Sequence, residues 1–286
     1  MFRGEETKTS PSFQLTPSID TTVGRIEQKL SKLKSEKEKA LVFFLTAGFP
    51  TLDATVDIAI ALEQGGADML EIGMPFSDPL ADGPAIQESS ALAIKNGVTL
   101  SFILEAVKSI RSRSSIPLVL MGYLNPILRF GEEKFFTSAA EAGVDGVILP
   151  ELPFEEIGRY KSLVNESGLS QILLVTPTTS QDRIRKIDAA SCGFLYCVST
   201  TGVTGSDHHS NIPKYLETIG ANARKNPLLV GFGISTPDDA ATIARSADGV
   251  IIGSALIRHL SHTTEPSEIT NWARGFRSAI DSYRQI

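Results

Sequence analysis

Two carboxylic acids, Glu71 and Asp82, stand in one short stretch that begins as an apolar run and ends as a loop. The run 68–73 has the composition of a strand buried in a parallel sheet, and Glu71 interrupts it. Proline and glycine residues hold the next segment out of regular structure, so Asp82 lies on a loop after that strand. An acid in an apolar setting and an acid in a solvated loop tend to have separated pKa values. One can then donate a proton while the other accepts a hydrogen bond as an anion.

Structural roles are the alternative for the acids of this stretch. Asp78, which precedes Pro79, is interpreted as a turn former that caps backbone N–H groups. A structural Glu71 would instead be a buried acid paired with Lys or Arg. We favour a chemical role for Glu71, because a lone carboxylate inside an apolar strand is costly and needs a reason.

Two glycine-rich turns late in the chain predict a phosphate site. Residues 231–235 follow the seventh predicted strand, and Gly253 with Ser254 follows the eighth. Glycine lets a ligand approach the backbone, and free N–H groups at the start of a helix bind anions. In a barrel, the turns after strands seven and eight form the usual phosphate site. Plain tight turns are the alternative.

A long polar loop, 199–209, follows the sixth predicted strand and is interpreted as a lid. It contains His208 and His209, but no third ligand is evident, so we predict no metal site. Aromatic residues at strand ends would form an apolar pocket between the acids and the phosphate turns. They are Phe44, Tyr123, Tyr196 and Phe232.

These residues need a scaffold, and the alternation of short apolar runs with amphipathic segments supplies one. The eight runs are 41–47, 69–74, 117–122, 146–149, 171–176, 194–198, 228–231 and 249–252. Helical segments between them include 53–62, 101–110, 132–141, 154–164, 181–190, 212–223 and 237–244. Eight strands each followed by a helix predict an α/β fold with a parallel sheet, and eight is the number at which such a sheet closes into a (βα)8 TIM barrel. An open doubly wound sheet remains the alternative, because a strand count does not prove closure.

Two further patterns support the barrel. Val23, Ile26, Leu30 and Leu33 recur at helical spacing, which predicts an additional N-terminal helix over the apolar bottom of the barrel. The segments 66–70, 143–147 and 246–250 repeat one junction, in which a small residue turns the chain and Asp precedes the next strand. A chain of βα units needs such a junction repeatedly.

Composition bounds the class of protein. The 286 residues are 42% hydrophobic and carry a formal net charge of -6, with no block of Lys or Arg, so nucleic-acid and anionic-membrane binding are disfavoured. No apolar run approaches the ~18 residues of a membrane span. The only cysteines are Cys192 and Cys197, which favours a reduced, cytoplasmic compartment. Residues 1–22 are predicted to be a polar, flexible extension, and 23–286 a single barrel domain.

Several segments together closely resemble the tryptophan synthase alpha subunit family. They are FLTAGFP at 44–50, LEIG at 70–73, PFSDPLADGP at 75–84, GVTG at 202–205 and GFGI at 231–234, and the similarity runs from about residue 24 to the C-terminus. The resemblance implies a (βα)8 barrel and retro-aldol cleavage of indole-3-glycerol phosphate to indole and glyceraldehyde 3-phosphate, in L-tryptophan biosynthesis. It implies no cofactor in this subunit. It also implies a pyridoxal-phosphate beta subunit as partner in an α2β2 heterotetramer, contacted near Asp78 and near 125–126.

The resemblance also assigns residues. Glu71 is implied as the acid–base residue and Asp82 as its partner. The implied substrate-binding residues are Phe44, Tyr123, Tyr196, Thr204, Gly205, Phe232, Gly233, Ile251, Gly253 and Ser254, with no metal ligand. Three residues depart from the family's pattern. Met74 replaces Ile or Val, Thr200 replaces an Arg of some members, and Glu151 stands where Asp is common.

Three other functions remain open. A stand-alone indole-releasing lyase would share the site without needing a partner. A barrel kept only as an allosteric or scaffolding subunit would have lost turnover, although Glu71 and Asp82 weigh against that. A sugar-phosphate isomerase would share the phosphate turns but would not need the loop 75–84.

Overall fold

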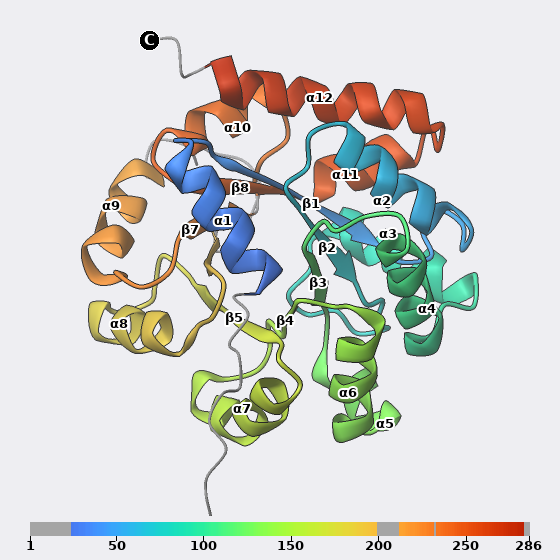
Figure 1. Ribbon diagram of the computed structural model, residues 1–286, viewed down its shortest axis with the longest axis horizontal. Helices are drawn as coiled ribbons and strands as arrows, with labels where there is room; N and C mark the ends of the chain where they lie inside the picture. The colour runs from blue at the N-terminus through green and yellow to red at the C-terminus, as the bar shows by residue number, and fades with distance from the viewer. Residues whose placement is uncertain (1–23, 199–211, 232, 283–286) are drawn as a thin grey trace, which may run out of the picture.

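Eight parallel strands close into a barrel in the computed structural model, which describes residues 24–198, 212–231 and 233–282 (Figure 1). Each strand pairs with its successor along the chain, and β8 pairs with β1, which confirms the barrel and excludes the open sheet. The strands are β1 (Ala40–Thr46), β2 (Met69–Gly73), β3 (Leu118–Met121), β4 (Gly146–Ile148), β5 (Ser170–Val175), β6 (Leu195–Val198), β7 (Leu228–Gly231) and β8 (Gly249–Ile252).

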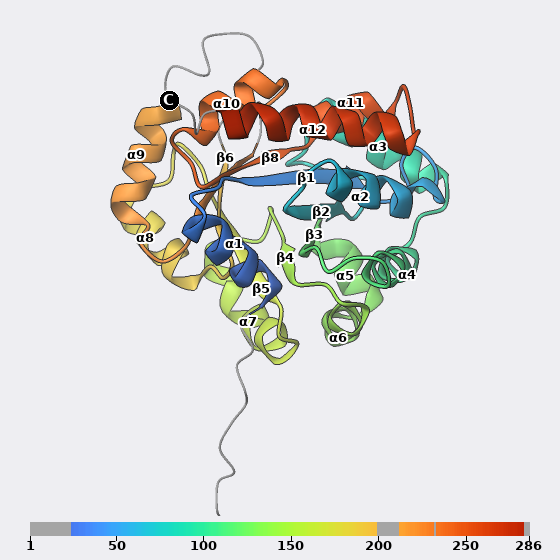
Figure 2. The same ribbon diagram turned by 45° about the horizontal axis from the view of Figure 1, so that its top comes forward.

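Helices surround the barrel on its outer side (Figures 1 and 2). In chain order they are α1 (Arg25–Ser35), α2 (Ala54–Gln64), α3 (Pro84–Lys95), α4 (Leu100–Arg111), α5 (Leu124–Phe130), α6 (Glu132–Ala142), the short 3₁₀ helix η1 (Phe154–Glu156), α7 (Ile157–Glu166), α8 (Gln181–Ala190), α9 (Ile212–Asn222), α10 (Pro237–Ala244), α11 (Ser254–Leu260) and α12 (Pro266–Ser282). Four of them, α3, α5, α11 and α12, are not among the helical segments named from the sequence. Two of these four, α5 and α11, have only seven residues each, which is too short for a clear periodic signal.

The N-terminal helix closes the bottom of the barrel, as its spacing predicted. Ile26, Leu30 and Leu33 of α1 belong to the same buried cluster as the inward-facing residues of the strands. A Cβ atom built on Gly146 or Gly193 would lie 3.1 or 3.0 Å from Ile26, so this side chain fills the space beneath β4 and β6. A second buried cluster lies between the strands and the outer helices.

The repeated junction has a specific hydrogen-bonding function. Each of its aspartates accepts a backbone N–H from the start of the preceding strand and returns its own N–H to the carbonyl of that same residue. The N–H to carboxylate distances are 3.0, 2.8 and 2.8 Å for Leu41 to Asp68, Leu118 to Asp145 and Leu228 to Asp248. The junction thus ties β1 to β2, β3 to β4 and β7 to β8 at the amino ends of the strands.

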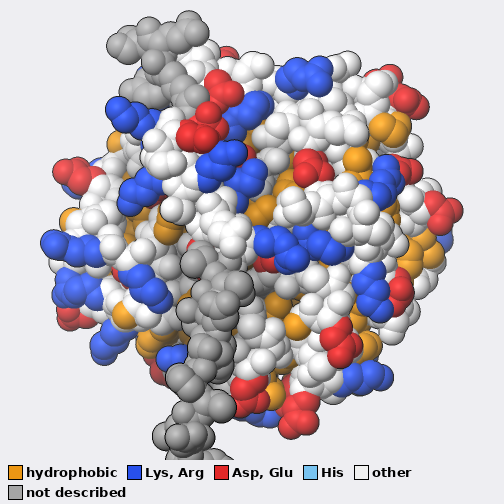
Figure 3. Space-filling model, viewed as in Figure 1, with side chains coloured by type: hydrophobic (Ala, Val, Ile, Leu, Met, Phe, Trp, Pro, Cys, Tyr) orange, Lys and Arg blue, Asp and Glu red, His pale blue; other side chains and the backbone are white. Residues whose placement is uncertain are grey.

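The surface carries mixed charge. On the face seen in Figure 3, Lys and Arg side chains are interspersed with Asp and Glu. Among the described helices, no single one is long and apolar enough to cross a membrane. Only α3 and α4 taken together, across a bend of 101°, meet that test of length and composition. Cys192 and Cys197 are both free thiols.

Candidate active site

Glu71 points into the barrel. Its register neighbours, Phe44 on β1 and Val119 on β3, belong to the buried cluster inside the strands. The Glu71 side chain is fully buried, and neither carboxylate oxygen has a hydrogen-bond partner among the described residues. Burial raises the pKa of Glu71 to about 8, because an ionised carboxylate would lose its hydration there. Glu71 is therefore largely protonated at neutral pH and able to donate a proton.

Asp82 lies on the loop that leaves β2 and is half-buried. Burial raises the pKa of Asp82 to about 6, while a hydrogen bond from the Tyr123 hydroxyl opposes this rise. Asp82 is therefore mostly an anion at neutral pH, when Glu71 is not. The two acids have the separated ionisation that the sequence predicted.

Tyr123 connects two loops at the mouth of the barrel. Its hydroxyl oxygen accepts the backbone N–H of Ala81 at 2.9 Å, in addition to the hydrogen bond with Asp82. Tyr123 itself follows β3 and is buried. The sequence predicted Tyr123 only as a wall of the pocket, whereas in the structure it also holds the Asp82 loop.

One small cavity, of only about 10 Å³, brings Asp82, Tyr123 and Phe44 together. Its other lining residues are Gly73, Met74, Ile86, Ser90, Met121, Gly122 and Pro150. Phe44 lies directly over the end of β2, since a Cβ atom on Gly73 would fall 2.4 Å from its ring. Its lining is mostly apolar, with one carboxylate and one phenol, which is the composition of a site for an aromatic ring. The space in this structure is no larger than a water molecule, so a bound ring requires the lining side chains to move apart.

Tyr196 reaches the same region from β6. It is buried in the inner cluster, and burial together with the nearby Glu71 and Asp82 raises the pKa of its phenol well above the usual value. A Cβ atom on Gly231 would fall 2.1 Å from the Tyr196 hydroxyl oxygen. From the sequence, Gly231 was expected to let a ligand approach the backbone. That interpretation was wrong for this glycine, because the side chain of Tyr196 occupies the space beside it.

The turn after β8 lies beside the cavity. A Cβ atom on Gly253 would come within 3.6 Å of Phe44 and 3.7 Å of Ile86, and Ser254 begins α11 immediately afterwards. Ile251 on β8 belongs to the inner cluster with Phe44. Gly233 adopts φ +76, a conformation that favours glycine.

Some of the residues predicted for the site lie outside the part of the chain that the structure describes, and others have contacts that the sequence did not predict. Thr204, Gly205 and Phe232, like His208 and His209, fall outside the described ranges. Asp78 lies in a turn, where its backbone carbonyl accepts the N–H of Leu80 at 3.0 Å and its carboxylate accepts the hydroxyl of Ser77. Within the described residues, no group of three or more His, Cys, Asp or Glu side chains could hold a metal ion.

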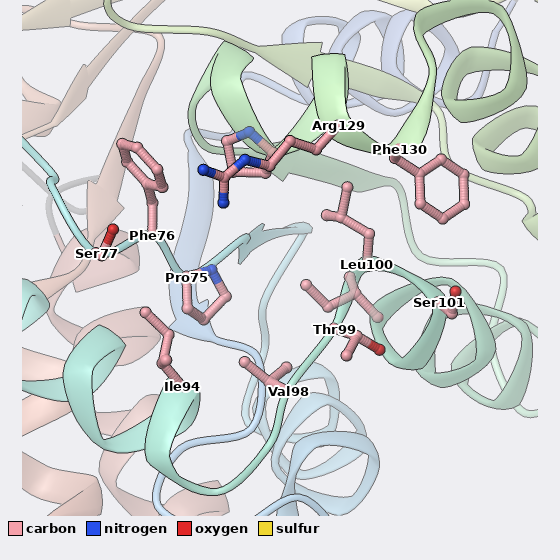
Figure 4. Close-up of a pocket in the computed structure, with 12 residues that line it drawn as sticks. Pro75, Phe76, Ser77, Ile94, Val98, Thr99, Leu100, Ser101, Arg129 and Phe130 are labelled. Atoms are coloured by element: carbon pink, nitrogen blue, oxygen red, sulfur yellow. The ribbon is translucent and has the colours of Figure 1, made fainter.

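A separate groove of about 490 Å³ lies outside the mouth, between the loop after β2, the α3–α4 turn and α5 (Figure 4). Pro75, Phe76 and Pro126 line it, and Arg129 extends over it toward Phe76. The Phe76 ring lies 5.3 Å from that of Tyr123, centroid to centroid, so the groove and the inner cavity share a wall.

Comparisons with known proteins agree on one family. The model of the tryptophan synthase alpha chain family matches residues 30–278. The chain is 50% identical over 239 residues to the tryptophan synthase alpha chain of Geotalea daltonii, covering 82% of this chain and 90% of that one. The structure of tryptophan synthase subunit alpha from Legionella pneumophila superposes with a TM-score of 0.84 at 38% identity, covering 91% of this chain and 100% of that one. An aminoacrylate-bound tryptophan synthase structure from M. tuberculosis gives a TM-score of 0.81 at 31% identity, covering 90% and 100%.

Proposed function

The chain belongs to the tryptophan synthase alpha chain family, and we propose that Glu71 and Asp82 carry out the family's reaction at the mouth of its barrel. It is a carbon–carbon lyase that cleaves indole-3-glycerol phosphate to indole and glyceraldehyde 3-phosphate in L-tryptophan biosynthesis. The observation that carries the residue assignment is Glu71, a fully buried acid without a hydrogen-bond partner among the described side chains, in a barrel whose mouth holds a second acid.

Retro-aldol cleavage needs two proton movements. A proton delivered to indole C3 makes the ring an electron sink, with the positive charge on the ring nitrogen. Loss of the proton from the adjacent glycerol hydroxyl forms the aldehyde, and the electrons of the breaking carbon–carbon bond return to the ring. Glu71, protonated at neutral pH because burial raises its pKa to about 8, donates the first proton. The carboxylate that remains can then accept the second.

Asp82 stabilises the intermediate charge. As an anion it accepts a hydrogen bond from the indole N–H, and this hydrogen bond strengthens as positive charge develops on the ring. The Tyr123 hydroxyl holds the loop that carries Asp82 by accepting the backbone N–H of Ala81. Since the chemistry consists of proton transfers, the subunit needs no cofactor of its own.

Substrate binding uses the two sides of the same mouth. Phe44, Tyr123, Tyr196, Phe232 and Ile251 bind the indole ring. The phosphate-binding residues in this proposal are Thr204, Gly205, Gly233, Gly253 and Ser254, with backbone N–H groups of the glycine turns as the donors. The proximity of Gly253 to Phe44 supports this arrangement, because a Cβ atom at position 253 would lie 3.6 Å from Phe44, which lines the pocket.

The partner is a pyridoxal-phosphate beta subunit in an α2β2 complex that receives indole. The groove of Pro75, Phe76 and Pro126 supports a contact surface near Asp78 and residues 125–126. Leu80, on the loop of Asp82, is 93% exposed, so a partner that covered this loop would bury its apolar side chain. The protein acts in the cytoplasm as one barrel domain from residue 23, with residues 1–22 as an extension.

The test is release of indole from indole-3-glycerol phosphate, with and without a beta subunit. We expect weak turnover alone and strong activation in the complex. Full turnover without a partner would instead identify a stand-alone lyase. Binding without cleavage, even in the complex, would identify a scaffolding subunit.

A further inference from the structure

Glu151, on the loop after β4, contacts the start of the neighbouring α5. Its carboxylate accepts the backbone N–H of Leu124. The residue before Leu124 is Tyr123, which is the N-cap of α5 and provides no side-chain cap of its own. The first N–H groups of a helix need acceptors, and a carboxylate is the favourable one at this end. Glu151 therefore fixes the backbone on which Tyr123 stands.

The connection continues from Tyr123 to the reacting groups. The Tyr123 hydroxyl holds Ala81 and Asp82, which joins the loop after β3 to the loop after β2. The carboxylate of Glu151 joins the loop after β4 to the same segment at Leu124. Pro150, the residue before Glu151, lines the cavity with Asp82 and Tyr123. The loop of Glu151 is thus part of the same wall.

We propose that Glu151 is a positioning residue for the reaction: it holds Tyr123, and through Tyr123 the Asp82 loop, while placing a second negative charge near the Asp82 carboxylate. This proposal rests on the catalytic role proposed for Asp82. Glu151 does not touch the cavity as a lining residue, so it acts through its neighbours.

Charge gives Glu151 a second effect. Among the described side chains, Tyr123, Tyr196 and Glu151 are the ionisable groups that interact with Asp82, and none of them is a cation. The negative charge of Glu151 raises the pKa of Asp82, in the same direction as burial, and it also raises the pKa of Tyr123. Glu151 therefore helps to hold the pKa of Asp82 near neutral pH. It also keeps the Tyr123 phenol neutral, so that the phenol can donate its hydrogen bond to Asp82.

The experiment separates the hydrogen bond from the charge. Glu151→Gln keeps an oxygen that accepts the Leu124 N–H but removes the charge, whereas Glu151→Ala removes both. The first readout is the titration of the Asp82 carboxyl carbon by NMR in the free protein, assigned with Asp82→Asn. We expect Glu151→Gln to lower the Asp82 pKa by about 0.3 of a pH unit or more, because a nearby like charge has been removed.

The second readout is kcat/KM for indole release against pH in the complex with the beta subunit. We expect the acidic limb of the kcat/KM profile of Glu151→Gln to move to lower pH, by the same amount as the pKa of Asp82. We expect Glu151→Ala to lose at least threefold in kcat near pH 7.5, and Glu151→Asp to restore part of that loss. Glu155→Gln is the matched control, since it removes one charge from the same connection, where Glu155 pairs with Arg183 instead. It should leave the Asp82 titration unchanged.

An unchanged Asp82 titration in Glu151→Gln, or an equal shift in Glu155→Gln, would overturn the proposal. If the titration shifts but the rate profile does not follow, the charge of Glu151 still acts on the ionisation of Asp82, and the error lies in the catalytic role of Asp82. The two claims are therefore distinguishable in one set of variants.

Discussion

The hydroxyl of Tyr196 occupies the space that any side chain at position 231 would need. A Cβ atom on Gly231 would lie 2.1 Å from the hydroxyl oxygen and 2.5 Å from the ring carbon that bears it. Real Cβ atoms do not approach other atoms so closely, so a larger residue at 231 must displace the tyrosine or the strand. The position of Tyr196 beside Glu71 and Asp82 thus depends on a glycine in the neighbouring strand.

Gly231→Ala is expected to lower kcat/KM for indole release at least tenfold, because the displaced Tyr196 ring would enter the pocket. In Tyr196→Leu the clash is absent. Adding Gly231→Ala to this variant should therefore reduce kcat/KM much less than it does in the wild type. The measurement is a double-mutant cycle on kcat/KM. Gly275→Ala is the control, since a Cβ there meets nothing within 4 Å. Additive losses would show that Tyr196 and Gly231 act independently.

Glu71→Gln is expected to reduce kcat by roughly 100-fold or more, the usual contribution of a general acid or base, while substrate affinity stays within a few fold. The amide has nearly the same shape but cannot deliver a proton to carbon. Single-turnover assays and direct binding measurements separate the two effects. Substantial residual turnover would refute the role of Glu71.

The same substitution should change the pH dependence of stability. The pKa of Glu71 rises from 4.5 in the unfolded chain to about 8 when folded. Between these values the folded protein keeps a proton that the unfolded chain has released, so the free energy of unfolding falls as pH rises, by at most about 1.4 kcal/mol per pH unit. Glu71→Gln lacks this effect and should gain a few kcal/mol over the wild type between pH 5 and pH 8.

Chemical denaturation of both proteins at pH 5 and pH 8 provides the measurement. Glu141→Gln, which changes an exposed acid, controls for the loss of a charge. An advantage of Glu71→Gln that is equal at both pH values would mean that Glu71 is ionised in the folded protein.

The pH profile of kcat/KM is expected to be bell-shaped. Activity should rise as Asp82 loses its proton near pH 6 and fall as Glu71 loses its proton near pH 8. The substrate phosphate also ionises near pH 6, so the discriminating variant is Asp82→Asn. It should lower kcat severely and remove the part of the acidic limb that belongs to the enzyme. An unaltered acidic limb would assign that limb to the substrate alone.

Gly253→Asp is expected to raise KM for indole-3-glycerol phosphate at least tenfold, with a smaller effect on kcat. The new side chain would crowd Phe44 and bring a negative charge to the turn proposed to hold the phosphate. Gly253→Ala, which adds only the Cβ atom, shows how much of the effect is steric. An unchanged KM in both variants would place the phosphate elsewhere.

The barrel could be predicted from the sequence because its signals are local. Apolar runs of strand length, and an aspartate placed at the same point of three junctions, do not depend on distant residues. Closure was less certain, since it is a property of the β1–β8 pairing and not of any single run. Helix α5 escaped the named segments because it is short, and only the start of α11, at Gly253 and Ser254, was expected.

The site was predictable only in part, for a physical reason. Glu71 stood out because a carboxylate inside an apolar run is energetically costly, and Asp82 stood out because it lies on the loop that leaves the same strand. The link from Glu151 to Tyr123 and Asp82 joins three loops that are distant in the sequence, and no local pattern marks it. The packing of Tyr196 against Gly231 was equally hidden, because a glycine after a strand looks the same whether a ligand or a side chain fills its space.

The three aspartate junctions mean that strand pairing is reinforced at one end of the barrel, while the proposed chemistry takes place at the other end. Asp68, Asp145 and Asp248 fasten neighbouring strands at the amino ends, far along each strand from the loops that carry the chemistry. Loops at the opposite rim can then vary in sequence, or be redesigned, without loosening these fasteners. An engineer seeking a new substrate for this scaffold would alter the rim and leave the aspartates untouched.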